Sequence, residues 1–163
     1  MYIINSAPGV GKSTLLKSLH SMLPDGFAIL DGDDLGRVTP YRNDTNWLNA
    51  IQDNLVGCCV NFRSYGYTRC IAGFVFPAEE RLNRITGMLI GEGFKVMHIL
   101  LDCGEAEIER RITQRNTSRI INVQQAQALS HQMKQLAADC RIDTTDISSQ
   151  EVANAVYASV TGG

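Results

Sequence analysis

The fold of this chain is decided by the stretch Ser6-Ala7-Pro8-Gly9-Val10-Gly11-Lys12-Ser13-Thr14. A short apolar run, Met1 to Ile4, comes before it, and a segment with leucines at helical spacing, 15–23, comes after it. This order predicts a strand, a glycine-rich loop and a helix. A loop that ends in Gly-Lys-Ser in that setting is typical of a site that holds a polyphosphate.

The residue types of this loop suit an anion for physical reasons. Small residues let backbone N–H groups turn inward around the phosphates, and the helix that follows adds unpaired N–H groups and the positive end of its dipole. Lys12 is placed to reach the β- and γ-phosphates, and the Ser13 hydroxyl to bind Mg²⁺. Ser6 stands where the full pattern has glycine, which a negative φ would allow. The expected phosphate ligands are Gly9, Val10, Gly11, Lys12, Ser13 and Thr14.

Bulk properties narrow the class of protein. The chain has 163 residues, 44% of them hydrophobic and 20% charged, which suits one domain with a substantial core over residues 1–163. The net charge of −2 argues against a general nucleic-acid binder, although a local basic groove is not excluded. No apolar run reaches the length of a membrane span, and no secretory signal pattern is found. The five cysteines form no Cys-x-x-Cys pair, so we expect reduced thiols in a cytoplasmic protein without a membrane partner.

Strand-like and helix-like segments alternate along the whole chain. This alternation predicts a parallel sheet with helices on both faces, a three-layer α/β/α fold. Capping residues mark several helix starts, with Asp44 or Thr45 before one helix and Ser148 with Glu151 before the last. The expected strands are 1–4, 27–30, 68–76, 95–102 and 141–143, and the expected helices are 12–23, 47–65, 78–91, 105–115, 123–138 and 149–160.

Acidic residues follow the second expected strand, in the order Asp31-Gly32-Asp33-Asp34. Ligands of open α/β sheets bind at the carboxyl ends of strands, and a carboxylate there could accept a proton from an attacking hydroxyl or help to hold Mg²⁺. A turn with a helix N-cap is the alternative, and the phosphate loop favours the functional interpretation for Asp33.

An acceptor-recognition element is one interpretation of the polar segment 35–46, and a solvated connection is the other. Arg37 in this segment and the neighbouring Asp34 are candidate substrate ligands together with Asp33. The expected strand 68–76 ends without an aspartate, and Gly73 within it leaves room for a substrate.

Arginines gather near the end of the expected helix 105–115. Arg111 and Arg115 are four residues apart and share a face, and a polar break, 116–119, follows them. Such a pair beside a polar segment could form a small lid near 110–122 that neutralises a phosphoryl group in transfer. A solvated face, with the arginines paired to glutamates of the same helix, is the alternative.

The chain resembles the P-loop NTPase fold, and within it the small-molecule kinases of the shikimate kinase, gluconate kinase and chloramphenicol phosphotransferase group. Four segments in the family's order carry the resemblance: 7–14, 30–35 (Leu-Asp-Gly-Asp-Asp-Leu), 111–115 (Arg-Ile-Thr-Gln-Arg) and 142–146 (Ile-Asp-Thr-Thr-Asp).

The resemblance implies a five-stranded sheet of order 2-3-1-4-5 and a lid after the fourth strand's helix. It further implies that Asp33 activates the acceptor hydroxyl and helps to hold Mg²⁺, and that Lys12 and Ser13 hold the phosphates of ATP and the metal. By the same resemblance Arg111 and Arg115 lie near the adenine and the transferred phosphate, and the loop containing Thr145 passes by the adenine.

The leading hypothesis is an ATP-dependent phosphotransferase that acts on a hydroxyl of a small molecule, as a monomer or a homodimer. A second hypothesis is a polynucleotide 5′-hydroxyl kinase, which would need Arg37, Arg42, Arg63 and Arg69 in one groove. A third is a nucleotide-dependent switch module without a small acceptor, and the missing aspartate on the third strand argues against it.

Overall fold

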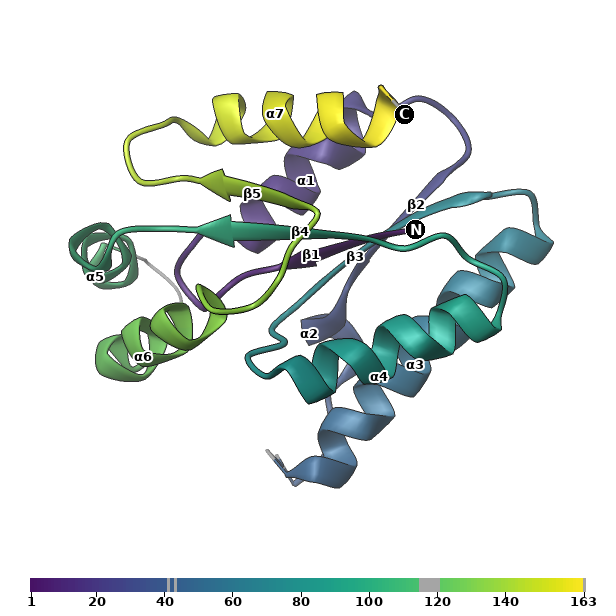
Figure 1. Ribbon diagram of the computed structural model, residues 1–163, viewed down its shortest axis with the longest axis horizontal. Helices are drawn as coiled ribbons and strands as arrows, with labels where there is room; N and C mark the ends of the chain where they lie inside the picture. The colour runs from purple at the N-terminus through teal and green to yellow at the C-terminus, as the bar shows by residue number, and fades with distance from the viewer. Residues whose placement is uncertain (41, 43, 115–120, 163) are drawn as a thin grey trace.

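A parallel sheet of five strands, in the order β2-β3-β1-β4-β5, forms the centre of the computed structural model (Figure 1). The structure describes residues 1–40, 42, 44–114 and 121–162. The strands are β1 (Tyr2–Asn5), β2 (Phe27–Asp31), β3 (Arg69–Phe74), β4 (Met97–Asp102) and β5 (Cys140–Asp143). The helices are α1 (Lys12–Met22), α2 (Gly32–Leu35), α3 (Thr45–Ser64), α4 (Glu79–Gly91), α5 (Glu105–Thr113), α6 (Val123–Met133) and α7 (Ser149–Thr161).

Strand β1 lies at the middle of the sheet because both of its faces are apolar. Successive side chains of a strand point to opposite faces, so Ile3 and Ile4 belong to different halves of the core. Ile4 packs in a cluster with residues of α1, α5, α6 and α7, and Ile3 packs in a cluster with residues of α3 and α4. Both isoleucines are fully buried, which is the pattern of a central parallel strand covered by helices on each side.

Helices cover the two faces as separate layers. Figure 1 shows α1 and α7 on one side of the sheet and α3 and α4 on the other. The Asp44 carboxylate caps α3 by accepting from the Trp47 N–H at 2.8 Å, and Ser148 with Glu151 forms a complete capping box at the start of α7. The expected three-layer fold and its strand order are confirmed.

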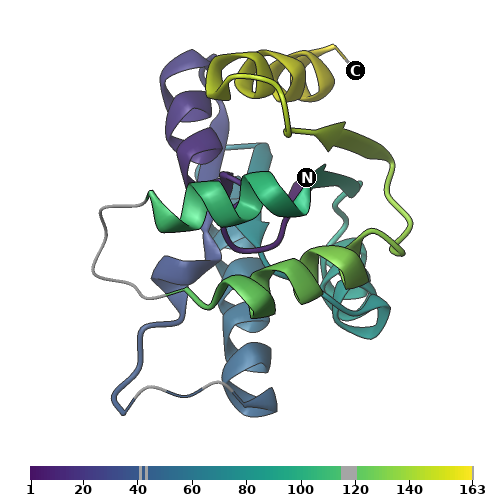
Figure 2. The ribbon, with the colours of Figure 1, turned by 90° about the vertical axis from the view of Figure 1, so that its left-hand side faces the viewer.

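The carboxyl ends of the strands face α5 and α6. Figure 2 turns this edge toward the viewer, and the two helices run across it. The loop after β1 and the segment after β2 emerge at the same edge, because all pairings in the sheet are parallel. Residues from distant parts of the sequence are thereby gathered at one end of the sheet.

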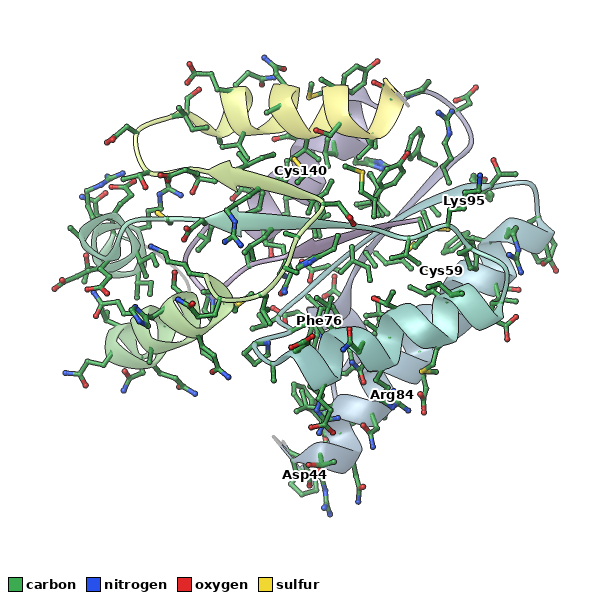
Figure 3. All side chains as sticks on the ribbon, in the orientation of Figure 1. Asp44, Cys59, Phe76, Arg84, Lys95 and Cys140 are labelled. Carbon is green, nitrogen blue, oxygen red and sulfur yellow. The ribbon has the colours of Figure 1, made fainter. Side chains whose placement is uncertain are left out.

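Several boundaries differ from the sequence prediction. A short helix, α2, occupies residues 32–35, and the Asp31 side chain is its N-cap, a capping role that the sequence offered as an alternative for this acidic segment. Strand β3 ends at Phe74 rather than at Phe76, and the Asn5 side chain replaces the next ladder bonds. Its Nδ2 donates at 3.0 Å to the carbonyl of Phe76, a residue labelled in Figure 3, and its Oδ1 accepts from the Phe76 N–H at 2.8 Å. Helix α6 ends at Met133, five residues before the expected end.

No helix in the described part of the chain is long and apolar enough to cross a membrane. All five cysteines are free thiols.

Candidate active site at the phosphate loop

The loop between β1 and α1 has the backbone of an anion cradle. Gly9 and Gly11 have φ values of 88° and 115°, a left-handed region that favours glycine. Gly11 is also the N-cap residue of α1, and no side chain makes a capping hydrogen bond there. The first N–H groups of α1 are therefore left for a ligand, where the helix dipole adds a positive field.

Ser6 fits the loop in place of glycine. No non-glycine residue in the described chain has a positive φ, so the Ser6 backbone carries no left-handed strain. The side chain is fully buried, and its Oγ has no hydrogen-bond partner among the described residues. The serine thus costs the loop no backbone strain.

Lys12 and Ser13 converge on one carboxylate, that of Asp31. The distance from Lys12 Nζ to Asp31 Oδ1 is 3.2 Å, and Ser13 Oγ donates to Asp31 Oδ2 at 2.9 Å. Burial raises the pKa of Asp31, but the Lys12 charge and the hydrogen bonds from Ser13, the Asp33 N–H and Lys12 outweigh it and hold the pKa below its ordinary value of 3.8. The carboxylate is therefore ionised at neutral pH.

Asp31 also organises the residues that follow it. Its Oδ1 accepts from the Asp33 N–H at 3.1 Å and so caps α2. Asp33, the second residue of α2, lines the cavity beside the phosphate loop. Sequence reasoning singled out Asp33 and missed Asp31, although the apolar run 27–30 leading directly into Asp31 places this residue at the strand end.

Gly73 lies beneath the Lys12 side chain. A Cβ at Gly73 would come within 2.8 Å of Leu16 Cδ1 and within 3.1 Å of two methylene carbons of Lys12. The space that we expected a substrate to use is therefore taken by the lysine stem. Gly73 and Asp31 are register partners in the β2–β3 ladder. Strand β3, which ends without an aspartate, therefore lies next to β2, whose last residue is Asp31.

A first cavity of about 360 Å³ opens beside the loop, on the side of α3 and α6. The phosphate loop from Ala7 to Ser13 forms its floor, with Asp33 at one edge. Trp47 and Phe74 form one wall, with ring centroids 6.4 Å apart. This volume is in the range of small-molecule sites.

A second cavity of about 290 Å³ lies on the other side of the loop. Its walls come from the start of α1, from α5 and from the β5–α7 connection. The two cavities share Gly11 in their linings, so a molecule in each could meet at the loop. The lining of the second cavity is Val10, Gly11, Thr14, Leu15, Leu101, Glu107, Arg110, Arg111, Ile147, Ser148, Ser149 and Val152.

Arg111 ties the phosphate loop to two other segments. Its Nη1 donates to the Val10 carbonyl at 2.8 Å, its Nη2 to the Thr144 carbonyl at 2.6 Å, and its Nε to Glu107 at 2.7 Å. Hydrogen bonds from Arg110 and Arg111 lower the pKa of Glu107 to about 2, so this partner stays charged. A guanidinium that donates to three separate acceptors is held in place more firmly than one that makes a single hydrogen bond.

Other expected site residues lie elsewhere. Asp34 and Arg37 are exposed, form an ion pair of 2.6 Å with each other, and are outside both cavity linings. The Thr145 hydroxyl accepts from the Gly104 N–H at 2.9 Å, and Thr145 also lies outside both linings. From the β5–α7 connection, the residues that line the second cavity are Ile147, Ser148 and Ser149. Arg115 and the lid residues 116–120 lie outside the described residues.

The donor set beside the loop suits Mg²⁺. Ser13 Oγ and the carboxylates of Asp31 and Asp33 are hard oxygen ligands, and Mg²⁺ prefers one or two such groups together with waters and substrate phosphates. No cluster of three or more His, Cys, Asp or Glu residues that could hold a metal ion occurs in the described part of the chain. The residues fit a metal that arrives with a nucleotide.

The fold and the loop together define a P-loop protein. The chain belongs to the AAA domain family, whose sequence model matches residues 1–141. No curated protein sequence matches the chain significantly.

Solved structures of similar fold come from several kinases and a resistance protein. A tunicamycin resistance protein from Deinococcus radiodurans is 22% identical, with a TM-score of 0.73 over 98% of this chain and 95% of that chain. A gluconokinase from Sinorhizobium meliloti is 14% identical, with a TM-score of 0.70 over 99% and 91%. The APS kinase of Mycobacterium tuberculosis is 16% identical, with a TM-score of 0.67 over 95% and 94%. The resemblance to P-loop kinases is thus confirmed at the level of the fold.

Proposed function

We propose that this protein is an ATP-dependent phosphotransferase that moves the γ-phosphate of Mg·ATP to a hydroxyl of a small molecule. The observation that carries the proposal is the pair of cavities that meet at Gly11, one on each side of an anion-binding loop. The second cavity would take the nucleoside of ATP, and the first would take the acceptor. Such an arrangement brings donor and acceptor together at the γ-phosphate.

The residues of the loop hold and position the phosphates. The backbone N–H groups at the start of α1 and the Lys12 ammonium would bind the β- and γ-phosphates, which replaces part of the Lys12–Asp31 contact. Mg²⁺, held by Ser13 Oγ and by a nearby carboxylate directly or through water, would neutralise charge between the β- and γ-phosphates. Asp31 orients both Lys12 and Ser13 before the nucleotide arrives.

Asp33 is assigned the role of general base. Its carboxylate would accept the proton of the acceptor hydroxyl as the oxygen bonds to the γ-phosphorus, while the bond from that phosphorus to the β–γ bridging oxygen breaks and ADP leaves. Arg111 would contact the nucleotide from the wall of the second cavity. Arg115 would stabilise charge on the phosphoryl group in transfer.

The test is release of ADP from Mg·ATP with a panel of sugars, sugar acids, nucleosides, hydroxylated antibiotics and a 5′-hydroxyl oligonucleotide. One acceptor class should stimulate release in the native protein and fail to do so in Asp33→Asn. If ATP binds and no acceptor stimulates release, the phosphotransferase proposal is rejected in favour of a nucleotide-binding module.

The polynucleotide alternative gains no support from the arginines that it requires. Arg69 begins β3 and stacks on the Phe27 ring at 4.1 Å, and Arg63 stacks on Phe94 near the end of α3. Both lie toward the amino ends of the strands, whereas Arg37 follows the carboxyl end of β2. A single groove does not contain all of them.

A further inference from the structure

Thr144, the first residue after β5, holds Arg111 with both its side chain and its main chain. Its Oγ1 donates to the Asp102 carbonyl at 2.9 Å and accepts from Arg111 Nη1 at 3.1 Å. Its backbone N–H donates to the same Asp102 carbonyl at 2.9 Å, and its own carbonyl accepts from Arg111 Nη2 at 2.6 Å. Thr144 is 1% exposed and is thus a buried link between the last residue of β4 and the arginine of α5.

The Thr144 hydroxyl has a defined direction. A carbonyl can only accept and a guanidinium can only donate, so the hydroxyl proton points to Asp102 and a lone pair points to Arg111. Serine would keep both bonds and lose a methyl group. Valine would keep the shape and lose both bonds, which leaves the buried N–H of a charged group without this acceptor.

Arg111 carries this arrangement to the phosphate loop. The Nη1 that bonds the Thr144 hydroxyl also donates to the Val10 carbonyl at 2.8 Å. The Val10 carbonyl and the Gly11 N–H belong to one planar, trans peptide unit, so they point in opposite directions. Fixing the carbonyl toward Arg111 therefore also fixes the direction of the Gly11 N–H.

This peptide unit needs such a fixed direction. Gly9 and Gly11, on either side of Val10, both have a positive φ, and glycine backbones are the least restricted of all. A loop that must be ordered when the phosphates arrive loses part of its binding free energy to that ordering. A bond that holds the loop in place beforehand avoids this loss.

We propose that Thr144 is a positioning residue for the nucleotide, which acts through Arg111 to fix the Val10–Gly11 peptide unit in the orientation that binds phosphate. The inference rests on the proposed function only in taking the loop to bind the phosphates of a nucleotide. It adds a residue that lies outside both cavity linings and outside the loop motif.

Thr144→Val and Thr144→Ser form the matched pair of variants. Both should lower the free energy of unfolding, one by losing hydrogen bonds and the other by losing a buried methyl group. Only Thr144→Val should raise the Kd for Mg·ATP, by about three- to thirtyfold, the effect of losing one or two hydrogen bonds of a charged group. Thr144→Ser should bind like the native protein.

Two further measurements separate positioning from general destabilisation. The Kd for Mg·tripolyphosphate, which has no nucleoside, should rise in Thr144→Val by about the same factor as the Kd for Mg·ATP. In the ligand-free protein, amide hydrogen exchange of residues 9–14 should be faster in Thr144→Val than in Thr144→Ser. Thr161→Val, which removes a hydroxyl bond to the Tyr157 carbonyl at the end of α7, is the control and should change neither.

A double-mutant cycle tests the route through Arg111. In the Arg111→Ala background, Thr144→Val should have no further effect on the Kd for Mg·ATP, because the hydroxyl has lost the group through which it acts. Calorimetric titration would measure all four proteins, and circular dichroism would show that each one folds.

Each outcome has a separate meaning. An equal rise of Kd in Thr144→Ser and Thr144→Val, or an effect of Thr144→Val that persists without Arg111, would overturn the positioning role. So would unchanged exchange of residues 9–14 in Thr144→Val. The expected binding pattern without transfer of phosphate to any acceptor would support the positioning role and count against the phosphotransferase function, so the two proposals can fail independently.

Discussion

Asp31 and Gly73 are register partners on adjacent strands, and the Lys12 side chain lies over the pair. The glycine provides room for the lysine stem, and the aspartate carboxylate lies 3.2 Å from the ammonium. The carboxylate that orients the phosphate loop thus comes from β2, on which Asp31 is the last residue. The two acidic residues of the site, Asp31 and Asp33, consequently have different surroundings and should behave differently when changed.

We expect Asp31→Asn and Asp33→Asn to separate metal and phosphate positioning from proton transfer. Asp33→Asn should lower kcat by about 10²–10⁴ with ATP binding nearly intact, because it removes the proposed general base while Lys12, Ser13 and Asp31 remain at the phosphate loop. Asp31→Asn should raise the Mg²⁺ concentration needed for half-maximal turnover, because the partner of Ser13 loses its charge. Metal titrations of turnover and calorimetric ATP binding would measure both, and identical profiles for the two variants would contradict the division of roles.

Gly73→Ala should disturb Lys12 directly. The added methyl would contact Leu16 and the lysine stem at 2.8–3.1 Å, so Lys12 must shift away from the phosphate position. We expect weaker ATP binding together with a loss of stability of about 1–3 kcal/mol, the usual cost of overpacking.

Gly57→Ala is the matched control for this substitution. It adds the same methyl on α3, where nothing lies within 4 Å, and should stabilise the helix by about 0.5–1 kcal/mol without changing ATP affinity. Calorimetric binding and chemical unfolding would measure both variants. Unchanged ATP affinity in Gly73→Ala would refute the packing argument.

Arg111→Ala should loosen the phosphate loop. It removes the bonds to Val10 and Thr144 and leaves the Glu107 carboxylate with Arg110 as its remaining arginine partner. We expect a higher KM for ATP, because the loop is less well ordered before binding.

Arg84→Ala serves as the matched control for Arg111→Ala. Arg84, labelled in Figure 3, bonds Gln52 and Asp53 of α3 and lies outside both cavity linings. Its removal should lower stability and leave KM for ATP unchanged. A KM that responds equally in the two variants would mean that general destabilisation, and not loop anchoring, is the cause.

The Asp31 ion pair should make stability depend on pH in the acid range. Because the folded-state pKa lies below 3.8, the contribution of Asp31 is fully present above pH 3.8 and is lost as the pH falls through the folded value. The free energies of unfolding of the native protein and Asp31→Asn should differ by a constant amount near neutrality and converge in acid. Urea unfolding across that range would measure this, and a gap that persists or widens in acid would contradict the assignment.

The fold could be predicted from sequence because its signals are local. The glycine-rich loop, the apolar strands and the capping residues Asp44 and Ser148 each act within a few positions, and each lies where it was expected. The end of β3 could not be predicted, because it depends on Asn5, which lies 71 positions away from its partner Phe76.

The site was only partly predictable for the same reason. Lys12 and Ser13 follow from the loop motif, but their shared partner Asp31 depends on the register of β2 beside β3. The aromatic wall depends on Trp47, which sequence periodicity marks only as part of a helix. Contacts between separate elements define the first cavity, and residue spacing along the sequence does not predict such contacts.

Asn5 restricts which residue types this position can accept. Its amide uses both a donor and an acceptor on the backbone of Phe76, and so holds the base of the phosphate loop against the strand that bears Phe74. Aspartate would place an oxygen against the Phe76 carbonyl, and an aliphatic residue would leave both backbone groups without a partner. Either replacement would therefore loosen the contact between the base of the phosphate loop and the strand that bears Phe74.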